Sequence, residues 1–475
     1  MNKQVKNICI FGTGSAGLIT ALSMNVYLPD VNVTLLNSTK HKNIGVGEST
    51  QPDLIDLLDI AGIDILDFIN HVDGTLKHGI YYKNWNKENV DYWHPFASLP
   101  RDGMYSRAHH YHQMSLKDPI NYPRQGYYKN VHPSYTLCVE NNLSSADIGH
   151  ALHVDSDKLA IYLKNYLKDK IRIIDCDTFN INHNNTQINS IIVNSNTTVE
   201  SDLFIDCSGF SRVLIGKISN LEEDEYEGAV NSAVVARINY TQDNVKSFPY
   251  TRAEAWSQGW IWTIPLQSRV GSGCLYNDKF CTDREAKTHF VNYWQGALKE
   301  EDIEKISFSS KSLKSPWVNN VVAVGLSSGF IEPLEATGIS WFVQSGRVLG
   351  AILQSRYYDE DIATRFNSII RGYIEDVQDF IDTHYLLSER KDSEFWQYQT
   401  SRTPSLRLNA RLELYRKLMP NINNRNKSYA WAFGDISWID ILTGYNFEFN
   451  NIEVPRWLTN QRQVENYRNP NEKIT

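Results

Sequence analysis

The 475-residue chain has little cysteine and no long apolar run. Its six cysteines form no CxxC or CxxxC pair, so neither a zinc site nor a disulfide framework is signalled, and a reducing cytoplasm fits. No stretch approaches the roughly 18 apolar residues of a membrane helix, and no apolar signal segment opens the chain. The net charge of -8 and the lack of a basic run argue against a nucleic-acid groove and an anionic-membrane patch. We therefore expect a cytoplasmic protein that acts on a small molecule.

The composition indicates a large folded protein. Hydrophobic residues make up 41% of the chain and charged residues 21%, which argues against wholesale disorder. Aromatic residues reach 12%, so a cavity lined by rings is expected. No internal repeat or low-complexity linker divides the chain, and we expect its parts to pack as one body.

The amino-terminal segment has the pattern of a dinucleotide-binding β-α-β unit. An apolar run at 5–11 leads into a glycine loop, a small-residue helix and a second strand at 31–36. Gly12 permits the tight turn, Gly14 lets the backbone approach a pyrophosphate, and Gly17 allows the helix to pack closely on the strand. The predicted cofactor-binding residues of this loop are Gly12, Gly14, Ser15, Ala16 and Gly17.

Four later positions are expected to face the same cofactor. The second strand ends in Asn37, where an acid usually binds the adenosine ribose, and its amide oxygen can still accept a hydrogen bond. Residues 171–209 read as a β-meander whose last strand ends near Asp206 and Gly209. A later buried strand ends in Gly325, and a long amphipathic helix follows it.

Two tryptophans lie one residue apart in a predicted strand. Side chains alternate along a strand, so Trp260 and Trp262 should share one face and form a wall of two large rings. Ordinary core packing is the alternative interpretation, because tryptophan is mostly buried.

The segment 101–135 is expected to be a long irregular region, a lid or a substrate wall. It holds several tyrosines and three histidines, of which His109 is the candidate substrate contact. The His-x-His spacing resembles a metal pair, but no carboxylate or cysteine stands at ligand spacing. No metal site is predicted.

Six motifs occur in the order in which they occur in flavin-dependent halogenases of the tryptophan-halogenase family, which the chain resembles over most of its length. The motifs are the glycine loop, residues 44–50 with Pro52, Leu76-Lys77-His78-Gly79 with Asn84-Trp85, His153-Val154-Asp155, Trp260-x-Trp262-x-Ile264-Pro265, and residues 329–339. The resemblance implies FAD as cofactor, FADH2 supplied by a separate NAD(P)H-dependent flavin reductase, molecular oxygen, and chloride, bromide or iodide. These make hypohalous acid for an organic substrate.

The resemblance also assigns a role to each motif. Lys77 corresponds to the family lysine that captures hypohalous acid, either by a hydrogen bond from its ammonium or as a haloamine. Glu335 corresponds to the glutamate that positions this agent or takes the ring proton. The resemblance implies a partition between flavin and substrate at Trp260, Trp262, Ile264 and Pro265, a halide site at Thr337 and Gly338, and further flavin contacts at Gly47, Glu48 and Ser49.

The predicted fold class is α/β, with a discontinuous Rossmann-type FAD-binding domain like that of flavin monooxygenases. Segments 1–85, 150–215 and 305–355 would build this domain. Segments 86–149 and 216–304 would form an inserted, β-rich substrate region, and 356–475 a mainly helical substrate or lid region that includes an amphipathic helix at 369–384.

The acceptor is expected to be an indole, phenol or pyrrole rather than free tryptophan. Candidate wall residues Phe395, Trp396 and Tyr445 match no clamp for an amino acid's ammonium and carboxylate. An FAD-dependent aromatic monooxygenase is the main alternative, and a flavin-binding protein without turnover is another. The single dinucleotide fingerprint indicates no nicotinamide site, while halide preference and homo-oligomerisation stay open.

Overall fold

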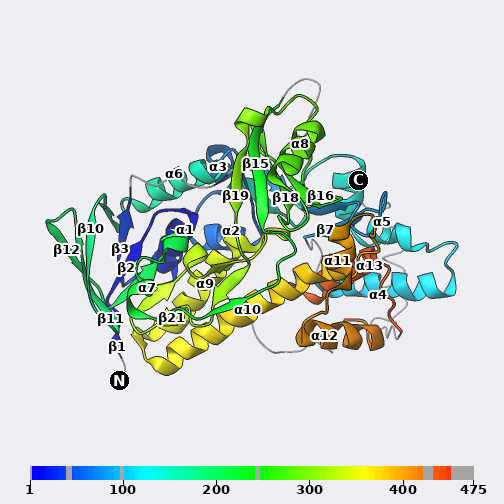
Figure 1. Ribbon diagram of the computed structural model, residues 1–475. Coiled ribbons are helices and arrows are strands. Elements are labelled where there is room, and N and C mark those ends of the chain that lie inside the picture. Colours follow the sequence, from blue (N-terminus) through cyan, green and yellow to red (C-terminus); the bar gives the residue numbers. More distant parts are fainter. Residues whose placement is uncertain are drawn as a thin grey trace.

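The computed structural model describes residues 3–38, 45, 47–96, 101–240, 247–420 and 432–450, with side chains from 107 onward in the stretch that begins at 101. Motif positions 44 and 46 and the end of the predicted helical region lie outside these residues. In Figure 1 the amino-terminal sheet lies at one end, a second sheet lies in the middle, and helices from the carboxy-terminal third lie at the other end. Among the described residues, no helix is long and apolar enough to cross a membrane.

A mainly parallel six-stranded sheet confirms the Rossmann-type prediction. Its strand order is β21-β22-β13-β2-β3-β9, with only β21 antiparallel to its neighbour. Strands from all three predicted segments lie in it, although the domain division itself stays a prediction. The strands are β2 (Asn7–Phe11), β3 (Asn32–Asn37), β9 (Arg172–Asp175), β13 (Leu203–Asp206), β21 (Trp317–Val318) and β22 (Val321–Ala323).

Helices α1 and α9 pack on each other beside this sheet. Both α1 (Ser15–Tyr27) and α9 (Thr337–Ile352) bury small residues where they meet: a Cβ on Gly346 would lie 2.4 Å from Oγ of Ser23. Further helices of this part are α2 (Asp53–Ile60), α3 (Ile65–His71), α6 (Ser156–Leu167) and α7 (Ile215–Ile218). The 3-10 turn η5 (Gly325–Ser327) links β22 to the short strand β23 (Gly329–Phe330).

A seven-stranded sheet, in the order β19-β15-β18-β17-β16-β6-β7, forms the middle of the molecule. The β-rich expectation therefore holds for 216–304, which supplies most of these strands. Their bounds are β6 (Gly79–Lys83), β7 (Tyr92–Pro95), β15 (Ser232–Asn239), β16 (Thr251–Trp256), β17 (Gly259–Pro265), β18 (Arg269–Tyr276) and β19 (Glu304–Ser307). Helix α8 (Asp283–Tyr293) packs against β15 and β18.

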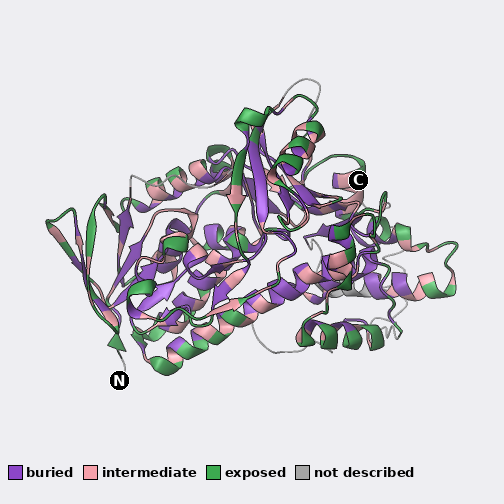
Figure 2. Ribbon diagram, viewed as in Figure 1, coloured by how far each residue is buried: buried purple, intermediate pink, exposed green. Residues whose placement is uncertain are grey.

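The remaining sheets are small. The predicted meander forms an antiparallel sheet whose outer strands are mostly exposed or half-buried in Figure 2, while the central strand is mostly buried. It comprises β10 (Phe179–Asn184), β11 (Gln187–Val193) and β12 (Thr197–Glu200). The others are β4 (Glu48–Ser49) with β8 (Ala151–Val154) and β5 (Thr75–Lys77); β14 (Glu223–Glu225) with β20 (Lys311–Leu313) and β23; and β1 (Lys3–Gln4) with β24 (Tyr357–Tyr358).

The expectation of an irregular stretch at 101–135 is wrong, because most of it is helical. It contains α4 (Arg101–Lys117), the 3-10 turn η1 (Arg124–Gly126) and α5 (Tyr127–Val131), and a π-helical turn, η2 (Tyr135–Glu140), follows. The described part of the inserted segment 86–149 is therefore mainly helical rather than β-rich. The helical face was hidden in the sequence because its buried positions include histidines and tyrosines, among them His109, Tyr111 and His112.

The described part of the carboxy-terminal third is mainly helical, as predicted. Helix α10 (Glu360–Leu386) is longer than the expected 369–384 and runs from beside β21 of the Rossmann-type sheet to the carboxy-terminal helices (Figure 1). It is preceded by the short turn η6 (Leu353–Ser355) and followed by α11 (Glu394–Ser401), α12 (Leu406–Lys417) and α13 (Asp435–Gly444). Two further short turns lie elsewhere in the chain: η3 (Gly209–Ser211) follows β13, and η4 (Glu300–Asp302) precedes β19.

Candidate active site

The glycine loop has the shape that a dinucleotide pyrophosphate requires. Gly12 has a φ of 110°, and a Cβ there would lie 2.6 Å from the carbonyl oxygen of Cys207. A Cβ on Gly17 would lie 1.9 Å from the carbonyl oxygen of Gly12. Helix α1 begins after Gly14 without a side-chain cap, so its first N–H groups are free of such a bond and suit an anion. These residues fit FAD.

The other predicted cofactor residues surround this loop. Gly325 has a φ of 78°, and a Cβ there would lie 2.5 Å from Cβ of Ala16, so η5 lies directly against the start of α1. Asn37 accepts a hydrogen bond from Oγ1 of Thr13 (2.8 Å) and donates to Asp175 (2.6 Å). Asn37 thus ties the loop to the end of the neighbouring strand.

Asp206 is engaged within the chain. Its Oδ1 accepts hydrogen bonds from the N–H and hydroxyl of Ser208 (3.0 and 2.6 Å), and its Oδ2 accepts from the N–H groups of Leu214 and Ile215 (2.8 and 2.9 Å). Asp206 therefore shapes the turn after β13, in which Gly209 has a φ of 68°. Nothing lies within 4 Å of a Cβ placed on Gly209.

The motif around Gly47 lies between two sheets. Gly47 has a φ of 142°, and a Cβ there would meet Cα of Gly271 at 3.4 Å. Burial, with the charge of Asp155, raises the pKa of Glu48 to about 7. Oγ of Ser49 lies 2.8 Å from Oγ1 of Thr251, which attaches this strand to β16.

Lys77 is a fully buried lysine at the end of β5. Its Nζ donates a hydrogen bond to the carbonyl oxygen of Thr50 (2.8 Å) and lies 4.9 Å from the ring centre of Phe96. Burial lowers the pKa of Lys77 to about 7, although the charge of Glu335 opposes this shift. The amine is therefore close to the balance between its neutral and charged forms at neutral pH.

Glu335, directly before α9, is a fully buried carboxylate with three donors. Its Oε1 accepts hydrogen bonds from the hydroxyl of Tyr82 (2.6 Å) and Nε2 of His384 (3.0 Å), and its Oε2 accepts from Nδ1 of His94 (2.9 Å). Burial alone would raise the pKa of Glu335, but the electrostatic attraction and hydrogen bonds of the His94 and His384 ring N–H groups outweigh it and hold the pKa well below its usual range.

Two tyrosines extend this cluster. The hydroxyl of Tyr92 lies 2.7 Å from Nδ1 of His384 and 2.7 Å from the hydroxyl of Tyr445. The rings of Tyr82 and Tyr92 stack with centres 4.6 Å apart. His94, His384, Tyr82 and Tyr92 were not among the site residues predicted from the sequence. Alternation in the Tyr-x-His segment of β7 could have placed two of them on one face, but no sequence signal joined them to α10.

The tryptophan pair lies in β17 as predicted. The ring centres of Trp260 and Trp262 are 6.1 Å apart with planes at 57°, which confirms a common face. Trp262 covers its cross-strand partner Gly273 so closely that a Cβ on Gly273 would lie 2.2 Å from the indole. Ile264 and Pro265 are buried in the same strand, and the Pro265 carbonyl accepts from Thr75 Oγ1 at 2.6 Å.

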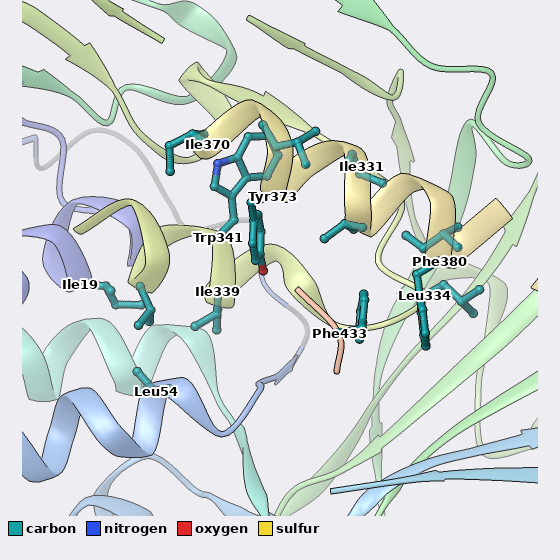
Figure 3. Packing of buried hydrophobic residues seen from close by; sticks show 14 of the residues in the cluster. Ile19, Leu54, Ile331, Leu334, Ile339, Trp341, Ile370, Tyr373, Phe380 and Phe433 are labelled. Atoms are coloured by element: carbon teal, nitrogen blue, oxygen red, sulfur yellow. The ribbon is translucent and has the colours of Figure 1, made fainter. Parts of the chain in front are cut away.

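The start of α9 presents backbone N–H groups that no described side chain caps. Ala336, its N-cap, has a left-handed φ of 56° and makes no side-chain cap bond. The helix begins at Thr337, and Gly338 is exposed, with nothing within 4 Å of a Cβ placed there. Behind this end, Ile339 and Trp341 belong to the buried cluster of Figure 3, which anchors the helix. The arrangement suits a small anion.

The four candidate substrate residues lie in different places. His109 is buried on α4, while Phe395 and Trp396 are fully buried on α11 and pack on Tyr385. Of these candidates, Tyr445 has a described hydrogen-bond path to Glu335, through Tyr92 and His384. No group of three or more metal-ligating side chains occurs among the described residues.

Comparisons with known proteins agree with this geometry. A family model described as tryptophan halogenase matches residues 7–453. A tryptophan 7-halogenase from Kutzneria sp. (strain 744) is 28% identical over 426 residues, covering 83% of this chain and 79% of that protein. A tryptophan 6-halogenase from Streptomyces albogriseolus is 27% identical over 445 residues, covering 88% and 83%. The solved structure of a flavin-dependent halogenase from Xanthomonas campestris superposes with a TM-score of 0.78 at 25% identity, covering 98% of this chain and 94% of that chain. The chain therefore belongs to the tryptophan halogenase family of flavin-dependent halogenating enzymes.

Proposed function

We propose that the enzyme uses FADH2, oxygen and halide to make hypohalous acid, which Lys77 passes to an electron-rich indole, phenol or pyrrole. The observation that carries this proposal is that Lys77 and Glu335 are both fully buried, with Nζ of Lys77 bonded to the Thr50 carbonyl and the Glu335 carboxylate bonded to three donors. Burying two ionisable side chains costs free energy, because both lose their hydration. A pair that is kept buried despite this cost therefore indicates a chemical task. Bound reduced flavin supplies the electrons that activate oxygen.

The flavin would be held by the glycine loop, by the turn at Gly325 and by the residues after Gly47. Their support is the close approach of backbones at Gly12, Gly17 and Gly325, where a side chain would collide with its neighbours. A separate flavin reductase would deliver FADH2, because the chain has a single dinucleotide fingerprint. Flavin-dependent halogenases generally need such a partner.

Lys77 would receive hypohalous acid at a site shielded from water. The Thr50 carbonyl and the Phe96 ring fix Nζ in place, and they stabilise its charged form. A pKa of about 7 makes both forms of the amine available, so the structure supports hydrogen-bond capture and haloamine formation alike. Halide would bind the uncapped N–H groups of Thr337 and Gly338.

Trp260 and Trp262 would keep the organic substrate away from the flavin. Their joined rings form a rigid wall in the middle sheet, and Gly273 holds Trp262 flat against β18. Ile264 and Pro265 would continue this wall along the strand. The wall directs oxygen chemistry to halide by exclusion, because an aromatic ring cannot reach the flavin through it.

The printed names of several relatives specify tryptophan, which makes free tryptophan a second candidate acceptor. We favour an aromatic substrate without an amino-acid group, because the candidate wall residues already make contacts within the protein. Phe395 and Trp396 are fully buried, and the hydroxyl of Tyr445 is bound to Tyr92. None of these three offers a charge to an ammonium or carboxylate group.

The test is a screen of halides against acceptors with FAD, NADH and a flavin reductase. Chloride, bromide and iodide are each combined with simple indoles, phenols, pyrroles and free tryptophan, and products are identified by mass. Halogenated indole, phenol or pyrrole supports the proposal. Hydroxylated product, or halogenation of free tryptophan alone, contradicts it. The control is Lys83→Ala, which removes a partly exposed lysine paired with Glu254 and should leave the product yield unchanged.

A further inference from the structure

The hydrogen bonds around Glu335 determine where protons lie in this cluster. An ionised carboxylate can only accept, so the three groups that point at it must donate. These are the hydroxyl of Tyr82, Nδ1 of His94 and Nε2 of His384. Each histidine therefore has its second ring nitrogen left for another partner.

The second nitrogen of His384 is already used. Burial lowers the pKa of His384, which favours the neutral ring, and Nδ1 then carries a lone pair. The hydroxyl of Tyr92 donates to this lone pair at 2.7 Å, and the Tyr445 hydroxyl in turn donates to Tyr92 at 2.7 Å. His384 is thus held between Glu335 and Tyr92 and has no lone pair for a substrate.

His94 differs in this respect. No described residue makes a hydrogen bond to its Nε2, and its side chain is 4% exposed, whereas Glu335 and His384 are 0% exposed. The ring of His94 lies 5.4 Å from that of Phe380 and 6.0 Å from that of Phe433, an apolar setting suited to an aromatic ligand. Figure 3 shows Phe380 and Phe433 side by side next to Leu334.

His94 is also placed next to the lysine. It lies on β7 opposite Ile80 of β6, the strand that begins two residues after Lys77. Phe96, two residues after His94, has its ring centre 4.9 Å from Nζ of Lys77. An aromatic ring that reaches an oxidant held at Lys77 would therefore come close to the end of β7.

Glu335 itself is badly placed to take a proton from a substrate. Both of its oxygens carry hydrogen bonds, and its side chain is fully buried. The donors that lower the pKa of a carboxylate also make it a weak base, whereas a neutral imidazole is well matched to neutral pH.

We propose that Nε2 of His94 takes the proton from the ring carbon during halogenation, and that Glu335 is the positioning residue that holds the His94 tautomer. The proposal rests on the proposed function and deepens it. The ring carbon attacks the halogen of HOX, the O–X bond breaks, and the electron pair of the C–H bond returns to the ring as its proton passes to Nε2. The leaving hydroxide takes up this proton, so ArH and HOX become ArX and water. The carbon is oxidised, because its bond to hydrogen is replaced by a bond to halogen, and the halogen of HOX is reduced by the same two electrons.

The matched variant is His94→Asn, because the asparagine amide can keep a donor at the position of Nδ1 while the Nε2 base is lost. With an indole and its ring-deuterated form as substrates, wild type should show a bromination isotope effect close to one. In H94N the loss of the ring proton should become limiting, so the isotope effect should rise clearly above one and bromination fall by about 100-fold. His384→Gln, which keeps a donor at the position of Nε2, should leave the isotope effect close to one.

Oxidation of an added thioether by bromide, oxygen and FADH2 separates this proposal from the proposed function, because a thioether loses no ring proton. Thioether oxidation retained in H94N, with a raised isotope effect, supports His94 as the base. Oxidation retained with unchanged indole bromination overturns the role of His94 and leaves the proposed function standing. If the wild-type enzyme neither oxidises the thioether nor brominates the indole, the proposed function is overturned.

A measurement on wild type covers the case in which H94N fails to fold. If Nε2 of His94 removes the ring proton faster than the halogen is transferred, the wild-type isotope effect should stay close to one with each ring-deuterated indole, phenol and pyrrole. A wild-type isotope effect clearly above one overturns the proposal.

Discussion

Gly273→Ala should displace Trp262 without removing it, which tests the partition directly. A Cβ on Gly273 would lie 2.2, 2.4 and 2.7 Å from three ring carbons of Trp262. An ordinary contact of 3.4 Å requires the nearest carbon to retreat by about 1.2 Å. Overpacking of this kind costs about 1–3 kcal/mol in the free energy of unfolding, and a displacement of about 1 Å at a reacting site can cost about 100-fold in rate.

The assay compares product formed with reduced flavin consumed. Wild type should convert a larger share of its FADH2 into halogenated product, while G273A should release more peroxide or free oxidant, because the wall no longer closes. Unfolding in urea should show the expected loss of stability, and indole fluorescence should report the altered setting of Trp262.

The control is Gly372→Ala, the same chemical change on α10, where nothing lies within 4 Å of the added Cβ. It should stabilise the helix by about 0.5–1 kcal/mol and leave coupling unchanged. A destabilised G273A variant that gives the same yield of product per reduced flavin would contradict a barrier at Trp262.

Three further predictions follow from the site. Lys77→Ala should lower halogenation by at least about 100-fold while FADH2 oxidation continues, whereas Lys83→Ala should not; product mass and flavin absorbance measure both. Burial lowers the pKa of Lys77 to about 7, so above that pH the unfolded chain binds more protons than the folded chain. The free energy of unfolding should therefore rise by up to about 4 kcal/mol between pH 7 and 10, relative to Lys77→Met, when both proteins are unfolded in urea. Parallel pH curves for the two proteins would contradict this prediction. Ala336→Gly should relieve a left-handed backbone cost of about 1 kcal/mol and retain the dependence of turnover on bromide, whereas loss of that dependence would argue against a backbone halide site.

The Rossmann-type part was readable because its signals are local. The glycine loop follows a strand and opens a helix within a few residues, and the collisions at Gly12 and Gly17 show why no other residue fits there. The shared face of Trp260 and Trp262 follows from strand alternation alone. The helix α4 was missed because its buried face uses histidines and tyrosines instead of aliphatic residues.

Local motifs were enough to predict the family, the dinucleotide loop, the tryptophan pair and the two residues, Lys77 and Glu335, on which the proposed chemistry depends. Only the tertiary structure joined Glu335 to His94 on β7 and His384 on α10, residues separated from it by 241 and 49 positions. Contacts over such distances leave no periodic pattern in the chain, because they depend on how the sheet, α9 and α10 pack. That packing decides which histidine nitrogen faces the carboxylate, and so which one is left for a substrate.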